Sequence, residues 1–324
     1  MPRPAATQPN PTEPNPTEPT PTEPTPTGTT EPDERAFDVV VVGSANLDLV
    51  ATVDELPGPG ESVRATTYAE HAGGKGLNQA VACARMGART AFVGCVGDDP
   101  AGAALRAVLE AEGVDVSGLA VVDEPTGRAM VVVDAHGENS IVVVAGANAR
   151  LDPTVADTLP TARVVLVQLE IPLATVAAVT AAAQRTGAVV VLNPAPAAPL
   201  PAEVLACVDV LTPNAGELDA IGGTARLHAA GVATVITTRG ADGVELSEGG
   251  AVSRVDAHRV SPVDTVGAGD AFSGALCAEL AAGLGLHDAV ATALVAGALA
   301  TTVRGAVPSL PTRTAVDAAV RPAR

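Results

Sequence analysis

The fold of this chain is constrained most by short runs of β-branched residues that recur from Phe37 onward, most of them followed by an alanine-rich stretch. The runs are DVVVVG (38–43), AFVGCVG (91–97), VVLVQLE (164–170), AVVVLNP (188–194), DVLTPN (209–214) and ATVITT (233–238). Such runs are typical of parallel strands that are buried on both faces by helices. The alternation therefore predicts an α/β fold of three layers, α/β/α, with a mostly parallel central sheet.

Composition limits the kind of partner. Apolar residues make up 47% of the 324 residues, but only four are Phe or Tyr and none is Trp, so the core must be aliphatic. The formal net charge is −18. Such acidity argues against broad binding to nucleic acid, which needs a basic face. It is compatible with a small anionic ligand in a locally positive pocket.

Cysteine usage and hydropathy predict a cytoplasmic protein. Cys83, Cys95, Cys207 and Cys277 form no CxxC pair and give no zinc spacing, so we expect reduced, mostly buried thiols. The first 35 residues contain no apolar segment typical of a secretion signal. The longest uncharged run, 290–303, is shorter than the roughly 18 residues that a membrane span needs.

The N-terminal part differs from the rest. Residues 10–27 repeat Pro-Thr-Glu units, and 11 of the 27 prolines precede Phe37. This composition predicts a disordered, solvated arm over 1–36 and one folded domain over 37–324. Two alternatives stay open: recruitment of a partner through the proline-rich arm, and a start codon assigned too far upstream.

Two stretches interrupt the alternation of strands and helices. ESVRATTYAE (61–70) and AMVVVDAHGENSIVVV (129–144) have strand character with no helix between them, and the second predicts a hairpin that turns around 135–139. We expect a small antiparallel β-sheet lid beside the main sheet, formed by about 49–70 and 127–146. An exposed flap of this kind covers a site, forms a dimer surface, or does both.

Polar residues follow the predicted strands where open α/β sheets bind ligands, at the C-terminal ends. They are Asn46, Gln168, Glu170, Asn193, Asn214 and Thr238. Asn46 and Asp48 form an amide–carboxylate pair that suits vicinal sugar hydroxyls, although the pair also suits a turn. Glu138, in the turn of the predicted hairpin, would reach the same hydroxyls from above, with an ordinary solvated turn residue as the alternative. Asn214 and Glu217 suit either water-mediated Mg²⁺ binding or capping of a helix.

The segment DTVGAGDAFSGAL (264–276) predicts an anion site at the start of a helix. Gly267, Ala268 and Gly269 allow close approach of a phosphate to backbone N–H groups, and Asp270 lies beside them. A carboxylate there suits a general base, with a simple N-cap as the alternative. No Walker A motif and no GxGxxG motif after the first strand is present, which argues against P-loop NTPases and dinucleotide-dependent dehydrogenases.

The segment AGGKGLNQA (72–80) leads into a helix predicted over Gly76 to Met86. Lys75 is the only lysine in a chain with 18 arginines. Its retention within a glycine loop indicates a compact ammonium group that faces a ligand.

These segments together resemble the ribokinase-like (PfkB) carbohydrate kinases, over Phe37 to about Pro311. Seven motifs occur in the family's order: GSANLD, AGGKGLNQA, HGEN, AGANA, NPAPA, TPNAGE and DTVGAGDAFSGAL. The resemblance implies ATP-dependent phosphorylation of the 5-hydroxyl of D-ribose, with Asp270 as the base and Gly267, Ala268 and Gly269 as the anion hole. It also implies Mg²⁺ with the nucleotide, a nearby K⁺ ion, and a homodimer formed through the lid.

The resemblance assigns further residues by their match to the family's motifs. Sugar contacts would come from Asn46, Leu47, Asp48, Gly73, Gly74, Lys75, Gly76, Asn78, Glu138 and Asp270. ATP contacts would come from Asn214, Thr238, Arg239, Gly240, Ala241, Asp242, Gly243 and Gly269. K⁺ would be bound by Asp264, Val266, Ala300, Val303, Gly305 and Ser309, and Mg²⁺ through water by Glu217.

Alternatives and departures remain. The segment between Asn214 and Thr238 is shorter than the family pattern, which leaves the adenine contacts, including one from Leu294, open. Another acceptor such as 2-deoxyribose, fructose or adenosine would use the same mechanism. A non-catalytic sugar-binding protein would have lost the base or the anion-hole glycines, and both are intact.

Overall fold

The computed structural model describes residues 1–4, 35–136 and 138–320. The predicted disordered arm therefore lies, apart from its two ends, outside the described residues. Contacts divide the chain into two units, Met1–Glu34 and Arg35–Arg324, and every helix and strand below belongs to the second unit.

The second unit is built on a nine-stranded sheet with the order β13-β12-β11-β10-β9-β8-β1-β4-β5. The strands are β1 (Phe37–Val42), β4 (Thr90–Gly97), β5 (Asp115–Val122), β8 (Ala162–Gln168), β9 (Val189–Asn193), β10 (Val210–Leu211), β11 (Thr234–Thr238), β12 (Val244–Glu248) and β13 (Ala251–Val255). The seven strands β5, β4, β1, β8, β9, β10 and β11, in their order across the sheet, pair in parallel, and β12 and β13 add an antiparallel edge. The predicted mostly parallel sheet is confirmed.

Alternate residues of the central strand β1 face two helical layers. Val39 and Val41 pack into a cluster with α1 (Lys75–Arg85), α2 (Pro100–Ala111), α7 (Ala268–Ala281), α8 (Leu286–Ala300) and α10 (Arg313–Val320). Val40 and Val42 pack on the other side with α3 (Leu173–Arg185), α4 (Ala202–Leu205), α5 (Ala215–Ala220) and α6 (Gly223–Ala229). The three-layer α/β/α prediction is therefore confirmed. Three 3-10 turns, η1 (Gly146–Arg150), η2 (Pro153–Thr158) and η3 (Gly240–Asp242), and the short helix α9 (Ala306–Ser309) complete the unit.

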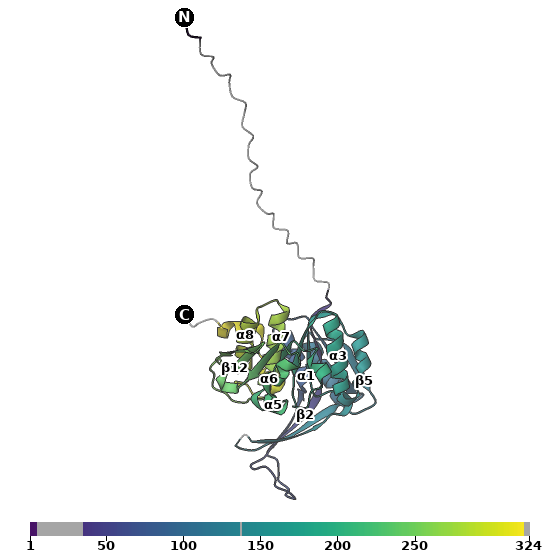
Figure 1. The fold of residues 1–324 in the computed structure, drawn as a ribbon. Helices are drawn as coiled ribbons and strands as arrows, with labels where there is room; N and C mark the ends of the chain where they lie inside the picture. Colours follow the sequence, from purple (N-terminus) through teal and green to yellow (C-terminus); the bar gives the residue numbers. More distant parts are fainter. Residues whose placement is uncertain (5–34, 137, 321–324) are drawn as a thin grey trace. The chain divides into compact units, whose positions relative to one another are not determined.

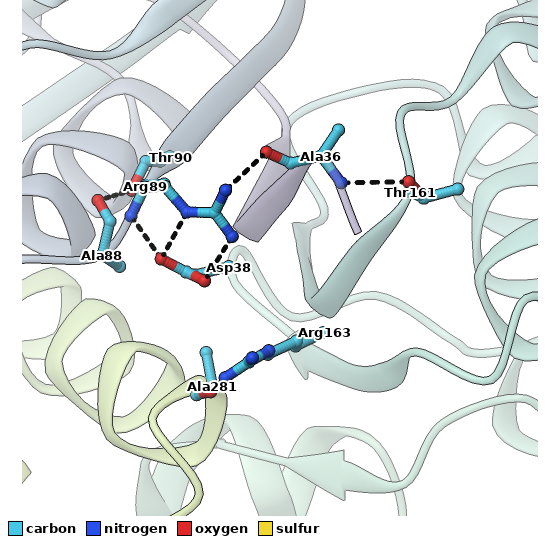
Figure 2. Close-up of polar contacts among 8 residues, drawn as sticks. All are labelled: Ala36, Asp38, Ala88, Arg89, Thr90, Thr161, Arg163 and Ala281. Atoms are coloured by element: carbon cyan, nitrogen blue, oxygen red, sulfur yellow. Dashed lines mark hydrogen bonds and ion pairs between the residues drawn. The ribbon is translucent and has the colours of Figure 1, made fainter. Parts of the chain in front are cut away.

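Figure 2 shows how β1 is held at its N-terminal end, opposite the ligand edge of the sheet. The Arg89 guanidinium, just before β4, donates to both carboxylate oxygens of Asp38 and to the carbonyl of Ala36. Ala36 in turn donates its N–H to Thr161, just before β8. Burial raises the pKa of Asp38, but the hydrogen bonds and charge of Arg89 outweigh it and leave this pKa below its usual value.

The small sheet has the order β3-β2-β6-β7 and projects from one end of this unit (Figure 1). Its strands are β2 (Asn46–Thr52), β3 (Thr67–Gly73), β6 (Gly127–Val133) and β7 (Asn139–Val144). The predicted 129–144 hairpin is confirmed.

Two expectations about the lid need correction. The lid begins at Asn46 rather than 49, and most of 61–70 is irregular because prolines and glycines at 57–60 precede β3. The sheet is also mixed rather than antiparallel, since β2 and β6 pair in parallel. Both strands leave the main sheet in the same direction, after β1 and after β5 respectively, which requires parallel pairing.

The predicted helix over 76–86 and the predicted free, mostly buried thiols are both confirmed. Helix α1 spans Lys75–Arg85, one residue earlier than expected. Cys83, Cys95 and Cys277 are buried, and burial raises the pKa of each of these three thiols, that of Cys95 to about 11. Within the described ranges, no helix combines the length and hydropathy that a bilayer crossing requires.

Candidate active site

The central residue of the site is Asp270, in the first turn of α7 and only 6% exposed. Its Oδ2 accepts from Asn78 Nδ2 and its Oδ1 from Gln79 Nε2, both at 2.9 Å. Helix α7 is capped by Gly267, not by the aspartate side chain. The capping alternative for Asp270 is therefore wrong, and its carboxylate is held by two amides of α1 instead.

The predicted anion hole lies directly before this carboxylate. Gly267 has φ +80°, a left-handed conformation that favours glycine and turns the chain into α7. The Ala268 N–H donates to the Thr265 carbonyl at 3.3 Å, so the turn already occupies one donor. A Cβ built on Gly269 would contact no other atom within 4 Å. Packing therefore does not require glycine at 269, which leaves ligand approach as the reason for a small residue there.

A cavity of about 220 Å³ opens at this helix start. It extends from Lys75, at the start of α1, to the ends of β9, β10 and β11. Its lining residues are Lys75, Asn193, Ala195, Thr212, Asn214, Glu217, Thr238, Thr265, Gly267, Gly269, Asp270, Phe272 and Ser273. The cavity brings together residues that sequence analysis assigned to the base, the anion hole and the nucleotide.

Asp48, on β2, faces the same region from the small sheet. Burial raises the pKa of its carboxyl to about 7, and the nearby carboxylates of Glu170 and Asp270 add to the rise. Asn46, two residues earlier, is 2% exposed, and its Oδ1 accepts from Asn148 Nδ2 at 2.7 Å. Leu47 lies between them on β2. Asn148, in η1, was not predicted as a site residue although it lies in the AGANA motif.

The glycine loop, Gly73 to Gly76, begins at the last residue of β3 and is shaped by its close approach to β2 and to the segment just before β2. A Cβ on Gly73 would lie 2.1 Å from Asp48 Oδ2. Gly74 has φ +88°, and a Cβ on Gly76 would lie 2.6 Å from the Ser44 backbone nitrogen. No larger residue fits at 73 or 76 without moving the groups that they contact.

We expect Gly73→Ala to disrupt the sugar end while leaving the core folded. The added methyl group would displace the Asp48 carboxylate, so the KM for the acceptor that binds there should rise by at least about tenfold, the equivalent of one hydrogen bond to a charged group. Steady-state kinetics with ribose and ATP checks this. Gly58→Ala is the matched control, because its Cβ would meet only the flexible end of Glu61, at 3.5 Å. An unchanged KM in Gly73→Ala would contradict the prediction.

Lys75 and Glu170 lie on either side of this loop's turn into α1. The Lys75 backbone N–H donates to Glu170 Oε2 at 3.1 Å, and the Ser44 hydroxyl donates to the same oxygen. Burial lowers the pKa of the Lys75 ammonium, but the charges of Asp270, Glu170 and Glu217 outweigh it and leave this pKa raised. Lys75 therefore keeps its positive charge at the cavity wall, as its retention within the loop predicted.

The assignment of Glu138 to the sugar needs correction. Asn46 pairs with Gly127 at the base of the lid, whereas Glu138 follows β6 beyond Val133, where its N–H donates to Asp134. Six strand residues separate these points, about 20 Å at 3.3 Å per residue. The acidic residue beside Asp48 is Glu170 instead. The position of Glu170 after a strand predicted that it lies at the ligand-binding edge of the sheet. It did not show that Glu170, rather than Glu138, is the acidic residue near Asp48.

The nucleotide candidates gather at the other end of the cavity. Asn214 caps α5 and forms a capping box with Glu217. The Glu217 backbone nitrogen donates to Asn214 Oδ1 and the Asn214 backbone nitrogen donates to Glu217 Oε2, each with a nitrogen–oxygen distance of 2.8 Å. The capping alternative for this pair is thus confirmed. Asn214 also bridges to Thr238 at the end of β11, which η3 follows. The remaining candidates lie in and beside η3: Arg239, Gly240, Ala241, Asp242 and Gly243. Leu294 packs in the core instead of lining the cavity.

The K⁺ candidates come from two segments that the structure joins. Asp264 accepts from the N–H groups of Val266 and Gly305 at 3.0 and 2.9 Å. The Thr301 carbonyl, next to Ala300, accepts from the N–H of Asp264. Ser309 Oγ donates to the Ala306 carbonyl. Val303 lies in the turn between these contacts.

A buried carboxylate beside a helix start, an ammonium group and a sugar-type polar cluster define a phosphotransferase site for a small hydroxyl compound. The chain belongs to the pfkB family of carbohydrate kinases, whose family model matches residues 36–313. Among its relatives, the ribokinase of Bacillus subtilis is 38% identical over 287 residues, which are 86% of this chain and 98% of that protein.

Solved structures agree with this assignment. A ribokinase from Thermotoga maritima superposes with a TM-score of 0.82 at 35% identity, covering 88% of this chain and 99% of its own. The Arabidopsis thaliana ribokinase, solved with ribose and ATP, gives a TM-score of 0.81 at 33% identity and covers 88% and 98%.

Proposed function

We propose that this chain transfers the γ-phosphoryl group of ATP to the 5-hydroxyl of D-ribose, giving D-ribose 5-phosphate and ADP. The observation that carries the proposal is the Asp270 carboxylate, held by two amides at the start of α7 and directly beside the cavity. The relatives named above are ribokinases, which supports ribose as the acceptor.

In this mechanism the residues mainly position reactants and stabilise charge. Asp270 accepts the proton of the 5-hydroxyl as its oxygen attacks the γ-phosphorus in line, and the bond to the ADP oxygen breaks. The backbone N–H groups of Gly267 and Gly269 and the Lys75 ammonium stabilise the negative charge on the transferring group, whereas the Ala268 N–H is bonded to the Thr265 carbonyl. Asn46, Asp48 and Glu170 orient the sugar through its other hydroxyls, which both donate and accept.

Mg²⁺ fits the nucleotide end when it is held mainly by phosphates and water. The described residues contain no group of three His, Cys, Asp or Glu that would bind a metal alone. Glu217 uses Oε2 in its cap and keeps Oε1 for a metal-bound water. Bound Mg²⁺ would neutralise phosphate charge.

K⁺ fits the joined segments at 264–266 and 300–309, because carboxylate and carbonyl oxygens are the donors that this hard cation prefers. Asp264 is the one charged oxygen donor in that set, and each of its oxygens retains a lone pair beyond its bond to an N–H group. Bound K⁺ would fix the segment that precedes the anion hole.

The lid supports a homodimer. Strand β7 is the outer strand of the small sheet, and Ile141, Val142, Val143 and Val144 are each about half exposed. An edge strand with consecutive exposed apolar residues is a surface for strand or face pairing with a second copy.

The test measures ADP release with Mg-ATP and D-ribose, with K⁺ or with a bulky organic cation. We expect ribose-dependent turnover that K⁺ raises several-fold. Parallel reactions contain 2-deoxyribose, fructose or adenosine. Faster turnover with one of these would overturn the substrate and keep the phosphoryl transfer. Ribose binding without turnover would support a sugar-binding protein and overturn the kinase proposal.

A further inference from the structure

A chain of buried side-chain amides lies behind Asp270. Gln79 is fully buried, and its Nε2 donates to Asp270 Oδ1 at 2.9 Å and to Asn193 Oδ1 at 3.1 Å. Gln168, also fully buried, donates its Nε2 to Gln79 Oε1 at 2.6 Å. Three elements, α1, β8 and β9, thus supply one hydrogen-bonded network that ends on the carboxylate.

The directions of the Gln79 and Asn193 amides in this network are fixed by their partners. A carboxylate only accepts, so Gln79 must present its Nε2 to Asp270 and its Oε1 to Gln168. A backbone carbonyl also only accepts, so Asn193 presents Nδ2 to the Thr212 carbonyl at 2.9 Å and Oδ1 to Gln79. Both ends therefore give Gln79 the same orientation, with its amide hydrogens toward the base.

We propose that Gln79 is a positioning residue for phosphoryl transfer: its amide holds the Asp270 carboxylate in the orientation that accepts the proton of the acceptor hydroxyl, and Gln168 keeps that amide from turning over. The inference rests on the proposed function, in which Asp270 is the base. Donation to the charged form of an acid favours that form, and the effect is strongest where water is excluded.

Sugar contact does not explain this network. Asn78 holds the other oxygen of Asp270 from the same helix, and its own Oδ1, which is buried, has no hydrogen-bond partner among the residues that the structure describes. That oxygen suits a substrate hydroxyl. Both hydrogens of the Gln79 amide and its oxygen are already used by protein groups, which leaves Gln79 no group for the substrate.

The test compares kcat–pH profiles of the full chain with Gln79→Glu and Gln79→Met. In the first variant a second carboxylate faces Asp270, so we expect the acidic limb of the profile to move up by at least one pH unit, with activity recovering at high pH. In the second the donor is lost without added charge. We expect kcat to fall about 10- to 100-fold, the effect of losing one hydrogen bond to a charged group. The acidic limb should move up by less than in Gln79→Glu.

The other charged groups around the base are Lys75 from α1, Asp48 from β2, Glu170 after β8 and Glu217 from α5. All four are the same in every variant, so a difference between profiles isolates position 79. Gln168→Met removes only the donor to Gln79. We expect kcat to fall and the acidic limb to move up, as in Gln79→Met, but by smaller amounts. It also serves if Gln79→Glu fails to fold.

The matched control is Thr175→Val, which removes an equally buried hydrogen bond, to the Leu151 carbonyl, on the opposite face of the sheet. It should lower the melting temperature without moving the acidic limb. An acidic limb that stays at the wild-type pH in both Gln79→Met and Gln168→Met would overturn the inference alone. Wild-type protein without sugar-dependent ADP release would overturn the proposed function instead.

Discussion

Asp270→Asn should lower kcat by about 10²- to 10⁴-fold, the usual contribution of a general base. Asn78 and Gln79 both donate to this carboxylate, so an amide at 270 would also turn a donor toward one of them. The measurement is single-turnover ADP formation at saturating ribose and ATP.

Ribose and ATP binding, measured by calorimetry, serve as the control and should change less than tenfold. The same assay on Asp264→Asn separates loss of the base from loss of the adjacent cation segment, because only the latter should depend on K⁺ concentration. Asp270→Asn with more than a tenth of wild-type kcat would exclude Asp270 as the base.

Asp48→Asn should lower kcat/KM for ribose by about 10²- to 10³-fold, through two weakened hydrogen bonds to hydroxyls. It should also stabilise the free protein. The pKa of Asp48 is raised from 3.8 to about 7, so the folded state holds a proton that the unfolded state releases in this range. Stability therefore falls as pH rises from about 4 to about 7, and above 7 the folded protein bears the full cost of the charge.

The free-energy cost of ionised Asp48 in the folded protein is roughly 1–2 kcal/mol once solvent screening at this partly exposed residue is taken into account. Asp48→Asn should therefore raise the melting temperature at pH 8 by about 2–6 °C. Near pH 4 the difference should vanish. Asp54→Asn, an exposed aspartate near the end of β2, is the control and should show neither effect. Equal melting temperatures of wild type and Asp48→Asn at pH 8 would contradict the assigned cost.

The alternation of buried strands and alanine-rich stretches was sufficient to predict the main sheet because those strands are covered on both faces. Strands β5, β12 and β13 were missed, and all three lie at or near an edge of the sheet, where one side meets solvent and the sequence is more polar. The parallel pairing of β2 with β6 was also missed, since it depends on a connection of more than seventy residues.

Local motifs predicted the parts of the site that lie within one turn of chain. Asp270, Lys75 and the glycine loop are of this kind. Glu170 was predicted only as a residue of the ligand edge, without a role at the sugar, and Asn148 was not predicted at all. Each meets its partner across about a hundred residues of sequence, a distance over which spacing carries no signal. Glu138 was chosen for its motif. Its position beyond the outer end of β6 shows that a motif alone does not determine whether a side chain lies close enough to contact the sugar.

Two of the groups assigned to the sugar, Asn46 and Asp48, lie on the small sheet. Glu170, Asp270 and the nucleotide candidates Asn214 and Thr238 lie instead at the ends of large-sheet strands or on α7. The segment 43–45 connects β1 of the large sheet to β2 of the small one. We therefore expect any shift of the small sheet against the large one to weaken acceptor binding while leaving the nucleotide candidates in place.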